Sequence, residues 1–171
     1  GTAPGRQARD AEELALLVDR AGDLTRPELA ARVAPSIAWR RGDPLATLLE
    51  GGRLVAARIP TRDGIQDRFV LIDDVPRYVA AFGPGVVTGV AAEPVLTERA
   101  ARREVLSRFV SLAGPVSIDD VRARYDFDPA ALHALFARVS YSATAVKLVT
   151  PSPTPSVKNW RVYQGRFLDP V

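Results

Sequence analysis

The sequence predicts an α+β, helix-rich chain of two tandem units, each with three helices followed by a β-ribbon, joined by a helical connector. A residue pattern that recurs after 92 positions, capping residues before each helical run, and strand-like segments after each third helix predict this class. We expect the first unit over residues 1–72, the connector over 73–96, and the second unit over 97–171. The end of the second unit is divergent, proline-rich and basic.

The repeat aligns Glu13–Val33 with Val105–Tyr125 without a gap, ELALLVDRAGDLTRPELAARV over VLSRFVSLAGPVSIDDVRARY. Such self-similarity usually marks a duplicated structural unit. In the first copy an apolar stripe at helical spacing predicts a helix that ends at Gly22; its members are Leu14, Leu17, Val18 and Ala21.

Capping residues predict the next two helices of each unit. Thr25 with Glu28 three residues later forms a capping box, and Ser117 with Asp120 forms a weaker one, because aspartate is the poorer partner. The third helices begin after Asp43-Pro44 and Asp128-Pro129, an N-cap aspartate followed by proline at the first helical position.

Each third helix is followed by strand-like residues, which is the order of a winged helix. The first ribbon is predicted from Arg53–Ile59 and Arg68–Ile72 around the turn signal Arg62-Asp63-Gly64. The second is predicted from Ala145–Val149 and Asn159–Tyr163, around a Pro/Ser loop. In the connector, Asp73 is expected to cap a helix over Asp74–Phe82 that Gly83 ends, and Thr97 with Glu98 opens the next helix.

Composition excludes several kinds of site. The chain has no cysteine, which excludes disulfides and thiolate metal sites and fits a reducing compartment, so we expect a cytoplasmic protein. Its one histidine, His133, lies among alanines and leucines, where we expect a structural or surface role rather than a metal site. No apolar run is long enough for a membrane span, and we expect no cofactor. A start at Gly1 without methionine favours a segment of a longer protein.

Arginines dominate the positive charge, and the net charge is +3. A GC-rich coding bias explains the preference for arginine over lysine as well as phosphate binding does. If the partner is a polyanion, the candidate contacts are Arg40, Arg41, Arg58, Arg62 and Arg68 in the first unit and Arg138, Lys147, Lys158 and Arg161 in the second. Trp39 and Trp160 are candidates for stacking on bases.

The candidates of the first unit also have a structural alternative. Trp39 fits a core position equally well, with solvated arginines beside it. Arg58 and Arg68 alternate with Ile59 and Phe69, which predicts one basic and one apolar face; an ordinary solvated hairpin shows a similar pattern.

Four stretches together resemble the C-terminal region of the large helicase-related (Lhr-type) superfamily 2 DNA helicases of bacteria: EELALLVDRAGDLTRPELAARV, GRLVAARIPTRDGIQDRFVLI, DDVPRYVAAFG and REVLSRFVSLAGPVSIDDVRARYDFDPAAL. The resemblance implies tandem winged-helix modules that follow an ATP-driven translocating core and take part in DNA binding and self-association. The resemblance also implies a bacterial, nucleoid-associated protein, and it fades beyond about Ala137.

The chain itself has no G-x-x-x-x-G-K-[ST] motif, so we expect an accessory segment that is not itself an enzyme, although the parent protein would be an ATP-dependent helicase. The expected partners are single-stranded or duplex DNA, with the helicase core of the same protein and further copies of the chain as other partners, and no membrane. Non-specific binding to DNA phosphates is the first interpretation, and a structural role in oligomerisation or in packing on the core is the second. The resemblance also implies a third, a winged-helix DNA glycosylase, for which Asp73 and Asp74 are the visible carboxylates.

Overall fold

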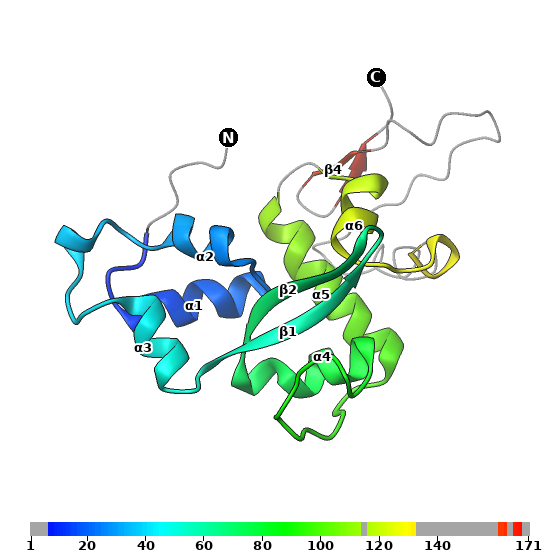
Figure 1. Cartoon of the computed structure of the whole chain (residues 1–171). Coiled ribbons are helices and arrows are strands. Elements are labelled where there is room, and N and C mark those ends of the chain that lie inside the picture. The colour runs from blue at the N-terminus through cyan, green and yellow to red at the C-terminus, as the bar shows by residue number, and fades with distance from the viewer. Residues whose placement is uncertain (1–6, 114–115, 133–160, 164–165, 169–171) are drawn as a thin grey trace.

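The computed structural model describes residues 7–113, 116–132, 161–163 and 166–168. Its helices are α1 (Ala11–Ala21), α2 (Arg26–Arg32), α3 (Pro44–Glu50), α4 (Val75–Phe82), α5 (Glu98–Ala113) and α6 (Ile118–Arg124), with short 3-10 turns η1 (Ser36–Ala38) and η2 (Ile72–Asp74) (Figure 1). Its strands are β1 (Leu54–Thr61), β2 (Gly64–Leu71), β3 (Val116–Ser117), β4 (Arg161–Tyr163) and β5 (Arg166–Leu168). None of the described helices is long and apolar enough to span a bilayer.

The predicted caps of the first unit are confirmed. Gly22, with a φ of 86°, follows the last residue of α1. The Thr25 hydroxyl accepts from the Glu28 amide at 3.3 Å, and the Glu28 carboxylate accepts from the Thr25 amide at 2.7 Å, which completes the capping box of α2. Asp43 accepts from the amides at the start of α3.

The caps of the second copy are confirmed as well. Ser117 and Asp120 form the capping box of α6, with the Asp120 amide donating to the Ser117 hydroxyl at 3.1 Å. A further helix begins at Pro129, after Asp128, and the described residues follow it to Leu132.

The start of the connector differs from the prediction. Asp73 is exposed and lies inside η2, so it does not cap α4. Asp74 occupies the N-cap position without a capping bond, because its carboxylate is buried in ion pairs with Arg77 and Arg108. The expected end at Gly83, with a φ of 97°, is confirmed, and α5 begins after Thr97 as predicted.

β1 and β2 form an antiparallel ribbon closed by the two-residue turn Arg62-Asp63, and both strands are longer than predicted. Leu24, in the link between α1 and α2, pairs with Phe69 on the free edge of β2. Val87 pairs with Ala57 on the free edge of β1.

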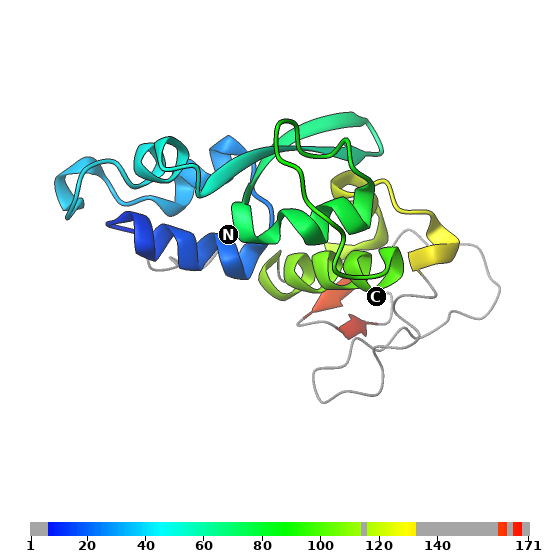
Figure 2. The ribbon, with the colours of Figure 1, turned by 90° about the horizontal axis from the view of Figure 1, so that it is seen from below.

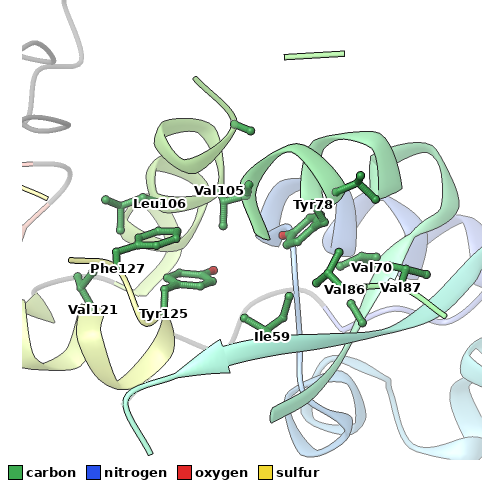
Figure 3. Close-up of a cluster of buried hydrophobic side chains, with 14 of the residues drawn as sticks. Ile59, Val70, Tyr78, Val86, Val87, Val105, Leu106, Val121, Tyr125 and Phe127 are labelled. Atoms are coloured by element: carbon green, nitrogen blue, oxygen red, sulfur yellow. The ribbon is translucent and has the colours of Figure 1, made fainter. Parts of the chain in front are cut away.

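The ribbon is shared by two hydrophobic cores. Near its base, Leu54, Phe69 and Leu71 pack on the core formed with α1–α3. The opposite face contributes Ala57, Ile59 and Val70 to a larger core with α4, α5 and α6. Figure 2 shows α4 and α5 side by side along the ribbon, and Figure 3 shows its side chains meeting those of α4, α5 and the residues after α6. The ribbon therefore lies between the two parts of the chain instead of projecting freely.

The fold is α+β and helix-rich, with a two-stranded ribbon after three helices, as in a winged helix. In the second copy, β3 pairs with β4 much as Leu24 pairs with β2. β4 falls within the predicted strand Asn159–Tyr163, and β5 is an additional strand. The predicted strand Ala145–Val149 lies outside the described residues.

Candidate nucleic-acid interface

The outer face of the ribbon, defined here as Arg58, Pro60, Ile65 and Asp67, is the face of its tip half that neither core covers. Arg58 is opposite Asp67 and Pro60 is opposite Ile65 in the strand register, so the four side chains point the same way. Arg58 and Asp67 are exposed, and Ile65 is 60% exposed. Arg62 is exposed at the turn, 3.4 Å from the carboxylate of its neighbour Asp63. On the ribbon, the predicted contacts Arg58 and Arg62 therefore face solvent.

Arg68 does not belong to this face. The register places it opposite Ala57 on the inner side, where its side chain is 1% exposed. Its Nη1 donates to Oδ2 of Asp23 at 2.6 Å. The expected grouping of Arg58 with Arg68 is corrected because positions one residue apart in register point to opposite faces. Arg68 offers no surface to a phosphate in this structure.

Asp23 is the centre of a buried cluster, the Asp23 network, whose other members are Glu28, Arg68, Tyr78, Arg124 and Tyr125. The hydroxyls of Tyr78 and Tyr125 donate to Oδ1 of Asp23 at 2.9 and 2.6 Å. Arg124 donates to the Asp23 backbone carbonyl at 2.6 Å and to Glu28 at 2.9 Å. Burial, followed by the negative charge of Asp23, raises the pKa of both phenols well above the ordinary value.

The tip of the ribbon is held against the segment around α6. The Arg62 amide donates to the Arg122 carbonyl at 3.2 Å, and the Asp126 amide donates to the Pro60 carbonyl at 3.0 Å. Beneath them, the rings of Tyr125 and Phe127 stack with centroids 5.3 Å apart, close to Ile59 of β1 (Figure 3). Because most of its inner face and part of its tip backbone are occupied, this wing presents its outer face, the turn side chains and the exposed Gln66 to a partner.

The other candidates of the first unit precede α3. Arg40 is exposed and forms ion pairs with Asp10 and Glu13. Arg41 is exposed. Trp39 is half-buried, and its indole N–H donates to the Ala34 carbonyl at 2.6 Å, so its polar edge is occupied. Only Arg41 of these three has no bond to another described side chain or carbonyl.

α3 occupies the position at which helix-turn-helix proteins read bases, and its sequence PLATLLE carries no basic side chain. An acidic cap, Asp43, precedes it and Glu50 ends it. Base reading in the major groove through α3 is therefore disfavoured.

The two carboxylates considered for catalysis are separated by their surroundings. Asp74 is 6% exposed and is held by Arg77 and by Arg108, the latter at 2.7 Å. Asp73 is exposed. Asp74 therefore has a structural role between α4 and α5.

The candidates of the second unit lie toward the C-terminal end of the chain. Arg138, Lys147, Lys158 and Trp160, together with His133, lie outside the described residues. Arg161 lies on β4, where the structure describes the backbone.

A comparison with protein families matches residues 1–98 to the winged-helix domain of large helicase-related protein. The chain belongs to this family. The match spans α1–α3, the ribbon and α4, and confirms the resemblance inferred from the sequence. No curated protein matches the chain. The large helicase-related winged helix contributes Asp23, Glu28, Arg68 and Tyr78 to the Asp23 network, and residues beyond the match contribute Arg124 and Tyr125.

Sequence reasoning missed the Asp23 network. One signal was visible: Asp23 is an acid between Gly22 and Leu24 in a link that is otherwise small or apolar. Its counterpart in the second copy is Pro115. An acid that one copy has and the other lacks indicates a contact specific to that copy.

Proposed function

We propose that this chain is an accessory nucleic-acid-binding segment of a DNA helicase, which contacts the phosphate backbone without reading sequence. Membership of the large helicase-related winged-helix family supports the helicase context. Non-specific contact, in place of base reading, follows from an α3 without basic side chains and a wing whose tip backbone is already bonded.

The observation that carries the proposal is the distribution of charge. Residues 7–132 contain 17 basic and 19 acidic side chains, a net charge of −2. Residues 133–171 contain five basic and one acidic, a net charge of +4. We therefore assign the main electrostatic attraction to the basic C-terminal residues and a secondary contact to Arg58 and Arg62 on the ribbon.

The test is fluorescence anisotropy of a labelled single strand and the matching duplex, measured with the full chain over a series of salt concentrations. Each phosphate contact that is lost should lower the slope of log affinity against log salt by roughly 0.9 for duplex and roughly 0.7 for single strands. Lys147→Ala with Lys158→Ala should weaken binding and lower the slope, and Arg58→Ala with Arg62→Ala should do so to a smaller extent.

The matched control is Arg20→Ala with Arg103→Ala, which removes the same charge from exposed positions on α1 and α5. Equal losses in all three double variants would mean that only net charge matters and would contradict the assigned surfaces. Absence of saturable, salt-dependent binding by the parent chain would refute the function itself.

A structural role is the second candidate, and the packed wing favours it. A ribbon with one face and its tip backbone in contact with the rest of the chain acts as a spacer between the two halves. Light scattering that shows self-association in the absence of DNA binding would support this candidate over the first.

We also propose that residues 97–171 form a second winged-helix unit. The repeated capping box, the helix that begins at Pro129 and the pairing of β3 with β4 support it. Backbone chemical shifts that place a strand at residues 145–149 would support the second ribbon, and helical or random-coil shifts there would contradict it.

A further inference from the structure

The Asp23 network joins parts of the chain that are far apart in sequence. Asp23 lies between α1 and α2, and its carboxylate accepts hydrogen bonds from side chains 45, 55, 101 and 102 residues away. These donors come from β2, from α4 and from the end of α6. A single carboxylate therefore holds together the first winged helix, the connector and the second repeat.

The helix-turn of a winged helix does not itself require this acid. The second copy retains the neighbouring capping box and β pairing, and carries Pro115 at the position that corresponds to Asp23. The role of Asp23 must therefore be sought in contacts outside its own helix pair.

The network is balanced in charge and is most deeply buried at its centre, Asp23 and Arg68. Two carboxylates, Asp23 and Glu28, face two guanidinium groups, Arg68 and Arg124. Asp23 is 0% exposed and Arg68 1%. Buried ion pairs of this kind add little net stability over apolar packing, but removal of one partner leaves an uncompensated charge and is costly. Such a cluster is best suited to fixing the relative positions of the elements that carry its side chains.

The two hydrophobic cores should respond differently to loss of the Asp23 network. The core around α1–α3 contains none of the Asp23 network's side chains, whereas Tyr78 and Tyr125 belong to the larger core. Loss of the Asp23 charge should therefore weaken the contact with the second repeat before it weakens the first winged helix.

We propose that the hydrogen bonds and ion pairs of the Asp23 carboxylate hold the first winged helix and the α5–α6 segment together as one rigid body. Neutralising Asp23 frees the α6 side while α1–α3 stay folded. This inference does not depend on nucleic-acid binding, and its test requires no ligand.

The test is amide hydrogen exchange by NMR on the full chain with Asp23→Asn. The amides of Arg62 and Asp126 report on the contact, because each donates across it to a backbone carbonyl. Both should exchange roughly ten- to a hundredfold faster, as expected for loss of a hydrogen-bonded buried charge, while the amides of α1 keep their protection. Unchanged exchange at Arg62 and Asp126 would overturn the proposal.

Asp74→Asn is the matched control. It neutralises another buried carboxylate held by two arginines, and it should accelerate exchange in α4 and α5 without singling out Arg62 and Asp126. If Asp74→Asn reproduces the exchange pattern of Asp23→Asn, the contact between the ribbon tip and α6 does not depend specifically on Asp23, and the proposal fails.

If Asp23→Asn unfolds the whole chain, the same exchange measurement is made on Tyr125→Phe. This variant removes one hydrogen-bond donor to Asp23 and retains the aromatic ring. Faster exchange at Arg62 and Asp126 than in α1 would then support the proposed role of Asp23. Equal acceleration throughout the chain would overturn it.

Discussion

The hydroxyl of Tyr125 donates to Oδ1 of Asp23 at 2.6 Å, although 102 residues separate them in the chain. The same oxygen accepts from Tyr78 of α4, so one carboxylate oxygen connects the connector and the second repeat to the first winged helix. Because both phenols are fully buried, this relationship governs how the chain responds to high pH.

Alkaline pH should destabilise the chain through these two tyrosines. Their raised pKa means that the unfolded phenols lose protons above about pH 10 while the folded ones keep theirs, so the free energy of unfolding falls as pH rises beyond that value. Urea unfolding between neutral pH and pH 11 measures the slope. Tyr78→Phe and Tyr125→Phe should each reduce it, and an undiminished slope in both would contradict the prediction.

Acidic pH should destabilise the folded chain through protonation of Glu28. Burial raises its pKa, but the hydrogen bond and charge of Arg124 and the bonds from Thr25 outweigh burial, so the net pKa lies below the ordinary 4.5. The stabilisation is therefore present above about pH 4.5 and is lost as pH falls through the lowered value. Glu28→Gln should flatten the acid limb of a stability–pH curve. Glu50→Gln, at an exposed position on α3, serves as control and should follow the parent chain.

Substitution of Gly22 by alanine should be strongly destabilising. Its φ is +86°, and an added Cβ would lie 2.8 Å from the Tyr78 hydroxyl oxygen, which is already committed to Asp23. Gly52 is the matched control, because its φ is +66° and nothing lies within 4 Å of its Cβ position. Gly52→Ala should cost only the backbone strain, roughly 1–2 kcal/mol, and Gly22→Ala clearly more in thermal unfolding. Equal losses would show that the Tyr78 contact yields without cost.

The two capping boxes should differ in importance. Thr25→Ala removes the cap of α2 and loosens Glu28, which also holds Arg124, whereas Ser117→Ala removes an exposed cap alone. Loss of a cap typically costs about 1 kcal/mol, so we expect about that for Ser117→Ala and more for Thr25→Ala. Urea midpoints measured side by side give the comparison, and a larger loss for Ser117→Ala would reverse the ranking.

Local signals in the sequence predicted most of the helices. The boxes at Thr25 and Ser117, the Asp-Pro starts of the third helices and the glycine ends depend on residues a few positions apart, so their chemistry is visible in a short window. Asp73 failed as a cap because a 3-10 turn moved the helix start by one residue and Asp74 found arginine partners elsewhere.

The candidate site was predicted less well because it depends on strand register and on distant contacts. Arg58 and Arg68 look equivalent in the alternating pattern, but the pairing of Ala57 with Arg68 places Arg68 on the inner face. Its partner Asp23 is 45 residues away, and no short-range pattern couples the two.

The neighbours of the ribbon also affect its behaviour in a concentrated solution. Leu24 pairs along one edge at Phe69 and Val87 along the other at Ala57, so neither edge is free along its whole length. A strand from another chain would find no continuous row of free amide and carbonyl groups to extend. Despite the exposed Ile65 near its tip, this hairpin should resist edge-to-edge aggregation and strand exchange between copies.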